Sequence, residues 1–274
     1  MYKLISIDMD ETLLNDQAQI TTGNAEGLKA ASRAGVKVVL NSGRGYASLQ
    51  DDLETLDLKG KAGQYVISYN GAAIIENEKN KVIHVDGLEF DVAKRLFNLM
   101  RVNYPQNSIH IYTVDTLYVY HMTDVDRNYL EPRGVKWVDL ENDNIDFLQD
   151  TPITKVIINI LSEDERKAFE QVVKENIPEK MTVTHSSGRY LEYNSASATK
   201  GNAMLYLAEK LGIKPEETIA VGDNGNDLSM IKAAGVGVAV KNAHAQVLKI
   251  ADYICQNDNN HDALQEVVQR FIES

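Results

Sequence analysis

The sequence is poor in cysteine and has no long apolar run. Its single cysteine, Cys255, cannot form a disulfide within the chain, which is typical of proteins of the reducing cytoplasm. The apolar segment from Leu4 to Ile7 is too short for a signal peptide, and no run approaches the length of a membrane span. We therefore expect a cytoplasmic protein without a membrane partner.

Positive charge is also scarce. The 274 residues include 28 lysines and arginines against 40 aspartates and glutamates, which gives a formal net charge of -12. A surface with this excess repels a phosphate backbone, so the charge balance argues against a nucleic-acid partner. A small phosphorylated molecule can still bind where a cation offsets the local negative charge.

Short apolar segments alternate with helical patterns near both ends of the chain. Leu4 to Ile7 and Val36 to Leu40 have the composition of buried strands, and so do Thr218 to Val221 and Gly237 to Val240. Helical patterns separate them along the chain. This alternation predicts an α/β fold with a doubly wound, Rossmann-like parallel sheet.

The pattern changes in the middle of the chain. Alternating segments such as Ser108 to Thr113 and Lys155 to Leu161 occur there with two further helical patterns. We interpret this stretch as an inserted α+β domain. The predicted core comprises residues 1–85 and 189–274, and the predicted insertion comprises residues 86–188.

The first strand ends in an acidic pair. Asp8 and Asp10 are two residues apart, so both side chains can point to one side as the chain leaves an extended strand. One carboxylate of such a pair can attack phosphorus while the other passes a proton to the leaving oxygen and later takes one from water. Alone, the pair is more often a solvated acidic turn.

The second strand is followed by Asn41-Ser42-Gly43-Arg44-Gly45, just before a helical pattern. The Ser42 hydroxyl, free backbone amides such as that of Gly43 and the helix N-terminus together favour an anion site, to which Arg44 can add a bidentate contact. The alternative is a capped strand-to-helix turn that carries a surface arginine.

Two further clusters follow the later strands. Lys200 begins a helical pattern, where a lone lysine is usually solvated. Asp223 and Asp227 lie in a glycine-containing turn and offer the hard oxygen ligands that Mg²⁺ prefers. An EF-hand calcium loop is excluded because its later glutamate is missing.

Together these clusters carry an excess of negative charge, with five carboxylates against two cations before any phosphate binds. A divalent cation is needed to make such a site hospitable to a phosphorylated ligand, and we expect Mg²⁺. The residues counted are Asp8, Asp10, Glu11, Asp223 and Asp227 against Arg44 and Lys200.

In this order the clusters resemble the four motifs of the haloacid dehalogenase (HAD) superfamily. The resemblance extends over nearly the whole chain to the Cof-type subfamily IIB, which includes the YidA-like sugar phosphatases, and the insertion is similar to that subfamily's cap domain of type C2B. The matching residues are Asp8-x-Asp10-x-Thr12, Tyr69-Asn70-Gly71-Ala72, Ser42, Lys200, Gly222-Asp223-x-x-x-Asp227 and Asn226-Asp227-Leu228.

The resemblance implies a Mg²⁺-dependent phosphatase that acts on small phosphorylated metabolites, above all sugar phosphates. Asp8 would form an aspartyl-phosphate, and Asp10 would protonate the leaving group and then activate water. Ser42 would hold a phosphoryl oxygen, and Lys200 would neutralise the nucleophile and the phosphoryl group.

The same resemblance implies the ligand sets. Asp8, the backbone carbonyl of Asp10 and Asp223 would bind Mg²⁺, with Asp227 holding waters or orienting the site. The residues expected near the phosphate or its ester oxygen are Gly43, Arg44, Asn70 and Asn226.

The sequence departs from the subfamily pattern at three places. Glu11 replaces a usual glycine, and we expect its carboxylate to point to solvent. Asn41-Ser42 replaces a common Ala-Thr, and Val240-Lys241-Asn242 replaces a usual Met-Gly-Asn.

Two other functions stay open. A phosphotransferase or mutase would use the same aspartyl-phosphate but pass it to a second sugar. A regulatory protein would accept phosphate without turnover, although Asp10 argues against it because a stable switch needs no general acid.

Overall fold

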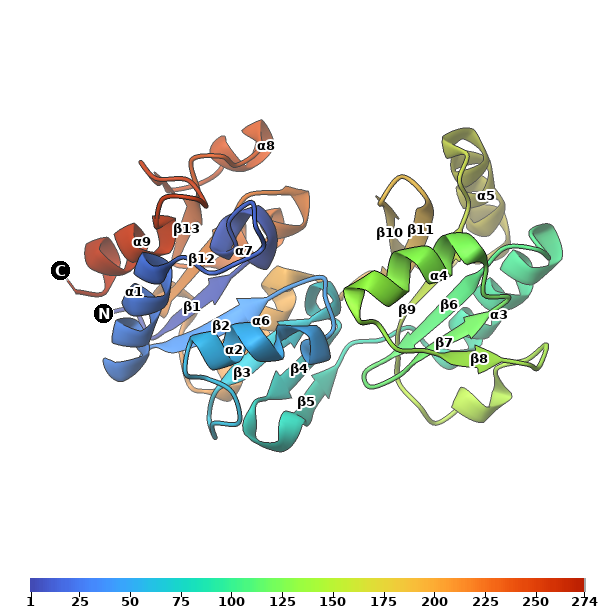
Figure 1. Ribbon diagram of the computed structural model, residues 1–274, viewed down its shortest axis with the longest axis horizontal. Helices are drawn as coiled ribbons and strands as arrows, with labels where there is room; N and C mark the ends of the chain where they lie inside the picture. The colour runs from blue at the N-terminus through green and yellow to red at the C-terminus, as the bar shows by residue number, and fades with distance from the viewer. Residues whose placement is uncertain (274) are drawn as a thin grey trace. The chain divides into compact units, whose positions relative to one another are not determined.

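The computed structural model describes residues 1–273, which form two compact units. The first contains residues 1–84 and the chain from residue 199 onward, and the second contains residues 85–198 (Figure 1). The sequence placed the return to the core between residues 188 and 189, ten residues earlier than this division. The difference arises because strand β11 (Tyr190–Ser195) pairs with two strands of the second unit, β9 (Ile153–Asn159) and β10 (Met181–Ser186).

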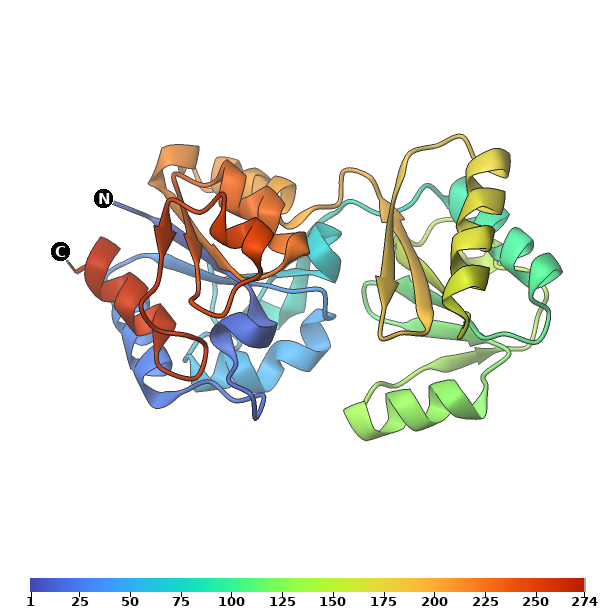
Figure 2. The ribbon, with the colours of Figure 1, turned by 90° about the horizontal axis from the view of Figure 1, so that it is seen from above.

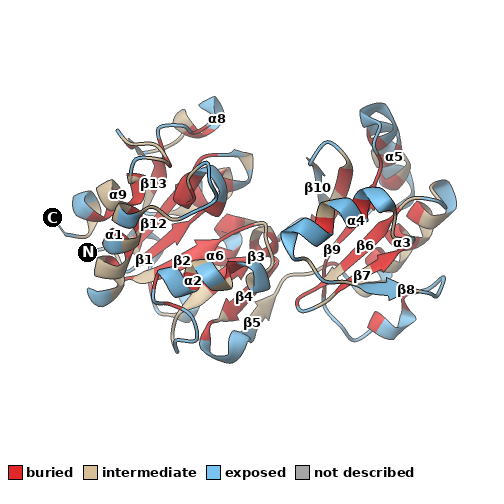
Figure 3. Ribbon diagram, in the orientation of Figure 1, coloured by how far each residue is buried: buried red, intermediate tan, exposed pale blue. Residues whose placement is uncertain are grey.

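The first unit is built on an eight-stranded sheet with the order β14-β13-β12-β1-β2-β3-β4-β5. Neighbours from β14 to β3 are parallel, and β3 and β4 pair in the antiparallel sense. The central strands are buried along their length (Figure 3), as expected for a sheet covered on both faces. The strands are β1 (Leu4–Ile7), β2 (Lys37–Asn41), β3 (Tyr65–Ser68), β4 (Ala73–Glu76), β5 (Lys81–Val85), β12 (Thr218–Gly222), β13 (Val236–Ala239) and β14 (Tyr253–Ile254).

Helices lie on both sides of this sheet (Figure 2). On one face, Leu4, Val39 and Ile67 form a core with side chains of α6 and α7, and elsewhere α1 packs against α9. The helices are α1 (Thr22–Arg33), α2 (Gln50–Thr55), α6 (Lys200–Lys210), α7 (Leu228–Ala233), α8 (Ala245–Leu248) and α9 (Ala263–Phe271).

Threonine caps set where two of these helices begin. The Thr21 hydroxyl accepts from the backbone N–H of Asn24 at the start of α1, and the Thr199 hydroxyl accepts from that of Asn202 at the start of α6. Such a bond satisfies one of the free amides of a first helical turn. The cap at Thr199 therefore makes Lys200 the first residue of α6.

The second unit has a six-stranded sheet with the order β10-β11-β9-β6-β7-β8. Phe97 of α3 and Phe169 of α5 belong to its main core, whereas Leu130 of α4 packs with Leu117 and Val119 of β7 in a separate cluster. The elements are α3 (Phe90–Asn103), β6 (Ile109–Thr113), β7 (Leu117–Tyr120), α4 (Asp124–Leu130), β8 (Val138–Leu140), β9 (Ile153–Asn159), α5 (Glu163–Asn176), β10 (Met181–Ser186) and β11.

These sheets confirm the predicted fold class, a doubly wound parallel-sheet core with an inserted α+β region. Among residues 1–273, no helix has both the length and the apolar character required to cross a membrane.

Candidate active site

The candidate site lies at the carboxyl edge of the first sheet. Strands β12, β1 and β2 are neighbours there, so Asp223, Asp8 and Ser42, which end or follow these strands, come from three separate parts of the sequence to one edge. Open α/β sheets bind their ligands at this edge. The sequence clusters were predicted to meet here for that reason.

Lys200 is the centre of the buried charges. Its side chain is completely buried, and its Nζ forms ion pairs with Asp8 Oδ1 and, at 2.7 Å, with Asp227 Oδ1. Burial alone would lower the pKa of Lys200, but the two carboxylates raise it above its usual value. Lys200 is therefore a fixed ammonium beside Asp8, and not the solvated surface lysine of the alternative interpretation.

The carboxylates outnumber this single ammonium. Burial raises the pKa of Asp8 to about 8, although the charge of Lys200 opposes the rise. Burial also raises the pKa of Asp223, against a 2.7 Å hydrogen bond that Thr12 donates to it. A carboxyl group with a raised pKa is in surroundings that disfavour its ionised form. The cluster therefore lacks positive charge.

The donor atoms fit a hard divalent cation. Carboxylate oxygens of Asp8, Asp223 and Asp227 lie within 4.8 Å of one another, and all three residues are buried. Oxygen donors of this kind suit Mg²⁺, and a cation here would supply the missing positive charge. The other oxygen of Asp227 accepts from the backbone N–H groups of Asp223 and Asn224, at 3.0 and 2.9 Å, which orients the turn.

Asp10 lies outside this buried cluster. Its side chain is 60% exposed, and both carboxylate oxygens accept from Arg44, one of them from Nε at 3.1 Å. Asp8 and Asp10 were expected to point into one site, but their side chains have different partners. The direction of Asp10 is decided by Arg44, which lies 34 residues later in the chain.

The residues expected around the phosphate form a connected group. The Ser42 hydroxyl accepts from the backbone N–H of Arg44 at 3.1 Å, and the Ser42 carbonyl accepts from that of Asn70 at 2.9 Å. The Asn70 side chain in turn accepts from Asn226 at 3.1 Å. A Cβ added at Gly43 would lie 3.1 Å from Asn70 Oδ1, so the glycine permits this close approach.

Three consecutive residues of this group have left-handed backbones. Tyr69, Asn70 and Gly71 have φ values of 56°, 57° and 103°. Glycine adopts this conformation readily, whereas a tyrosine seldom does. An Asn-Gly pair such as Asn70-Gly71 is a common turn signal, whereas no local pattern marks Tyr69 for a left-handed backbone.

Glu11 is exposed but lies close to the buried carboxylates. Its side chain is exposed, yet a carboxylate oxygen lies within 4.8 Å of Asp223 and His244 ligand atoms. The side chain is thus exposed, as expected, but its charge also acts on Asp223 and contributes to the raised pKa of that residue. The φ of Glu11 is 59°, a left-handed value that explains why glycine suits this position.

Two residues that the sequence did not assign to the site contact the backbone of Glu11 and of Asp223. Asn242 donates from its side chain to the Glu11 carbonyl at 2.7 Å, and the backbone N–H of His244 donates to the Asp223 carbonyl at 2.8 Å. A hollow of about 590 Å³ opens here, lined by Asp10, Glu11 and Asn242 among others. Only Asn242 had a sequence signal, as part of a variant segment.

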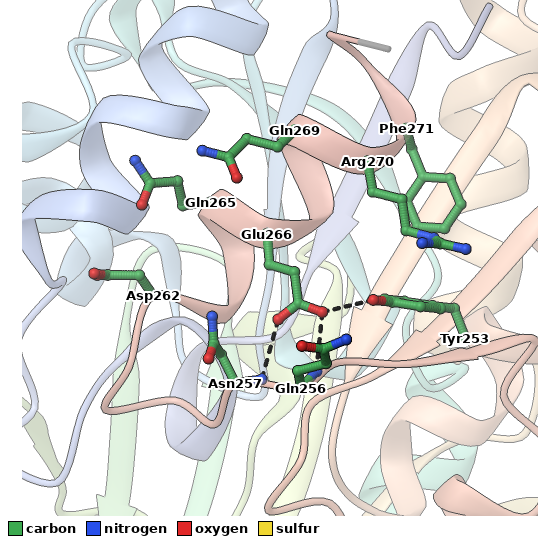
Figure 4. Close-up of a pocket in the computed structure, with 9 residues that line it drawn as sticks. All are labelled: Tyr253, Gln256, Asn257, Asp262, Gln265, Glu266, Gln269, Arg270 and Phe271. Atoms are coloured by element: carbon green, nitrogen blue, oxygen red, sulfur yellow. Dashed lines mark hydrogen bonds between the residues drawn. The ribbon is translucent and has the colours of Figure 1, made fainter.

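A second hollow, of about 680 Å³, lies between α9 and the segment around β14 (Figure 4). Its central carboxylate, Glu266, accepts from Tyr253 Oη and from the backbone N–H groups of Gln256 and Asn257. These bonds occupy the carboxylate in holding the chain together. The charged cluster of Lys200, by contrast, retains carboxylates without matching cations.

Comparison with known proteins identifies the family. The model of the haloacid dehalogenase-like hydrolases matches residues 5–268. The Bacillus subtilis protein YxeH is 36% identical over 273 residues, which cover 98% of this chain and 99% of YxeH. A second B. subtilis protein, the 5-amino-6-(5-phospho-D-ribitylamino)uracil phosphatase YcsE, is 30% identical over 275 residues, covering 98% of this chain and 96% of YcsE.

A solved structure has the same fold. The crystal structure of a haloacid dehalogenase-like hydrolase from Bacteroides thetaiotaomicron superposes with a TM-score of 0.85 at 30% sequence identity, and the match covers 99% of this chain and 100% of that one. These findings confirm the resemblance predicted from the four motifs. The chain belongs to the haloacid dehalogenase-like hydrolases, in the Cof-type phosphatase branch of that family.

Proposed function

We propose that the protein hydrolyses phosphate monoesters of small metabolites through an aspartyl-phosphate on Asp8. The observation that carries the proposal is Lys200, which is completely buried and held between Asp8 and Asp227 at the carboxyl edge of the sheet. A fixed ammonium beside a carboxylate at a ligand-binding edge suits a reaction in which negative charge gathers at phosphorus.

In the first step an Asp8 carboxylate oxygen attacks phosphorus and the bond from phosphorus to the ester oxygen breaks. The leaving oxygen takes a proton from Asp10. In the second step water attacks the phosphoryl group, its proton passes to Asp10, and phosphate leaves with Asp8 restored. Positioning and charge neutralisation supply most of the acceleration in such transfers.

The surrounding residues have supporting roles in this proposal. The Ser42 hydroxyl and the backbone amide of Gly43 hold phosphoryl oxygens, and Lys200 neutralises Asp8 and the phosphoryl group. Asn70 and Asn226, joined by a 3.1 Å hydrogen bond, contribute amide groups near the phosphate.

Asp10 requires a fixed direction to serve as the proton carrier. Arg44 accounts for that direction because its guanidinium binds both oxygens of the Asp10 carboxylate. A bidentate pair of this kind restricts the rotation of both side chains. We therefore assign Arg44 to Asp10 as well as to the substrate phosphate expected from the resemblance.

Mg²⁺ would be held by carboxylates of Asp8 and Asp223 and by the backbone carbonyl of Asp10, with Asp227 orienting the site. When bound, it would offset the charge of the carboxylates and of the phosphate. The raised pKa of Asp8 and Asp223 supports this requirement, because the carboxylates lack cations in its absence.

We further propose that residues 85–198 form a cap that selects the substrate, and that the protein acts in the cytoplasm. Sugar phosphates are the leading candidates. Support comes from YcsE, a relative that is named for a phosphate ester on a ribityl chain, which is a sugar alcohol.

The test is phosphate release from a panel of phosphorylated metabolites with Mg²⁺. We expect the unaltered protein to turn over repeatedly, and Asp8→Asn to lose at least about 10³-fold in kcat, because the nucleophile is gone. Asp10→Asn should retain slow phosphorylation of Asp8, which intact-mass measurement would detect. Asp51→Asn, an exposed aspartate of the same unit, is the matched control. Substantial activity in Asp8→Asn would refute the proposal.

A phosphotransferase is separated by adding acceptor sugars to the same assay. Hydrolysis predicts the same yield of inorganic phosphate with and without the acceptor. Transfer predicts a new phosphorylated sugar and less phosphate.

A further inference from the structure

Asn41 is a completely buried polar residue that directly precedes Ser42 of the proposed site. It ends β2, and its amide nitrogen lies 3.0 Å from Ser6 Oγ, 3.1 Å from the Lys200 carbonyl oxygen and 3.7 Å from Met230 Sδ. The carbonyl and the sulfur are acceptors only, so the amide nitrogen must face them.

The other half of this amide is unsatisfied. Asn41 Oδ1 is buried and has no hydrogen-bond partner among the described residues. Leaving a buried acceptor unpaired destabilises the folded protein, whereas an apolar side chain of similar size would avoid that cost. Stability alone therefore gives no reason for an asparagine here, and an unsatisfied buried group calls for another explanation.

The contact with Lys200 provides one. A lysine ammonium sits at the end of a long flexible side chain, so its position depends on how firmly the backbone is held as well as on its partners. Nζ is held by Asp8 and Asp227. The Lys200 carbonyl accepts a hydrogen bond from the Asn41 side chain, and this bond joins the end of β2 to the start of α6.

The start of α6 also packs tightly against α7. The backbone N–H of Gly201 donates to Ser229 Oγ at 3.0 Å, and a Cβ added at Gly201 would lie 2.4 Å from the Ser229 carbonyl oxygen. Small displacements of α6 are therefore opposed by α7. Asn41 supplies the corresponding constraint from the sheet.

We propose that Asn41 is a positioning residue that fixes the Lys200 ammonium against Asp8. The proposal rests on the proposed function, because it gives Lys200 a role in the reaction. Asn41 also directly precedes Ser42. The end of β2 therefore positions both Lys200 and the Ser42 hydroxyl that is proposed to hold the phosphoryl group.

The test compares Asn41→Leu, Asn41→Ser and Ser6→Ala. Leucine has the branching and the number of side-chain heavy atoms of asparagine but no donor, so we expect Asn41→Leu to keep or raise the melting temperature while kcat falls about 10-fold and KM stays within about threefold. Asn41→Ser restores a short donor and should recover part of kcat. Ser6→Ala removes a different contact of the same amide and should keep kcat within about twofold.

A binding measurement makes the test independent of turnover. The affinity for beryllium trifluoride with Mg²⁺, measured by calorimetry, should fall in Asn41→Leu and stay unchanged in Ser6→Ala. If Asn41→Leu does not fold, Asn41→Ala, which also lacks the donor, carries the test, and a folded Asn41→Ala variant with a kcat equal to that of the parent would overturn the proposal. Equal loss in Ser6→Ala and Asn41→Leu would also overturn it, since general core damage would then explain both.

The two proposals fail in different ways. A parent protein that releases no phosphate from the panel would refute the proposed function itself. An active parent with an equally active, folded Asn41→Leu variant would refute only the positioning role.

Discussion

Each unit of the protein contains a buried polar cluster, built on several carboxylates in the first unit and on the single carboxylate of Asp126 in the second, and the two clusters differ in how the negative charge is balanced. In the first unit, Asp8 and Asp227 share the single ammonium of Lys200. In the second unit, Asp126 is fully buried and accepts from Tyr190 at 2.7 Å, from Thr123 at 2.7 Å and from Asn159 at 2.8 Å.

The pKa shifts of these carboxyl groups have opposite signs. Burial raises the pKa of Asp8 and of Asp223. Burial also acts to raise the pKa of Asp126, but the neighbouring His110 and the hydrogen bonds from Tyr190 and Thr123 hold it below its usual range. A buried carboxylate with several hydrogen-bond donors is stabilised by the protein itself. A buried carboxylate that lacks positive charge around it is instead suited to binding a cationic ligand. The first cluster is therefore suited to function and the second to structure.

This comparison also accounts for Tyr190, the first residue of β11. Its hydroxyl donates to Asp126 inside the second unit and is buried there. We therefore regard Tyr190 as part of the structural cluster.

The largest effect should follow from breaking the satisfied cluster. Asp126→Asn puts an amide donor against the donors of Tyr190, Thr123 and Asn159, so we expect about 3 kcal/mol of destabilisation confined to residues 85–198. Hydrogen exchange read by mass spectrometry would locate the loss in that unit. Asp124→Asn, an exposed aspartate of the same helix, should stay within about 0.5 kcal/mol of the parent.

The same cluster predicts a pH dependence. Because the folded pKa of Asp126 is lowered, its contribution is present above the unfolded value of about 4 and is lost as pH falls through the folded value. The parent should thus lose more stability on acidification below about pH 4 than Asp126→Asn does. Equal losses would contradict the structural role of the carboxylate.

Arg44→Ala tests the exposed pair that lies outside both clusters. Freed from Arg44, Asp10 loses its fixed direction, so we expect kcat/KM to fall about 10-fold. Stability should change by less than about 1 kcal/mol, because the pair is largely exposed. Arg33→Ala, an exposed arginine of the same unit, is the control. A loss of stability larger than the loss of activity would argue against this role.

Asp223→Asn sharpens the contrast, because it should stabilise the protein where Asp126→Asn destabilises it. With metal removed by chelator, the change relieves repulsion among buried carboxylates and should add roughly 1 kcal/mol at neutral pH. The gain should shrink as pH falls below the raised folded pKa of Asp223 and should be lost near the unfolded pKa of about 4, below which the parent carboxyl is neutral in both states. Urea unfolding with and without Mg²⁺ measures both effects, and a destabilised variant would count against the charge excess.

Glu11→Gly should have the smallest effect. The carboxylate near Asp223 attracts a cation, but its exposure screens it, so the Mg²⁺ concentration for half activity should rise only about threefold. Glycine also suits the left-handed φ, which should raise stability by about 0.5 kcal/mol. Glu11→Gln should show the Mg²⁺ effect without the stability gain. A lower Mg²⁺ concentration for half activity in Glu11→Gly would mean that Glu11 hinders binding of the cation.

The sequence by itself determined which polar residues follow the buried strands. Buried apolar segments followed by Asp8, Ser42 and Asp223 predict a shared edge, because parallel neighbouring strands end on the same side of a sheet. Lys200 was placed there too, although only the structure revealed that it is completely buried.

Only the tertiary structure decided how the side chains are directed and where the units divide. Asp10 turns to Arg44, Glu11 reaches Asp223, and β11 pairs within the second unit, each through a partner distant in the sequence. Local patterns report which residues leave a strand together, but these directions depend on contacts between residues that are far apart in the chain. Asn41 is the clearest case. Its amide nitrogen meets the Lys200 carbonyl and its amide oxygen is left without a partner only because β2 packs against α6.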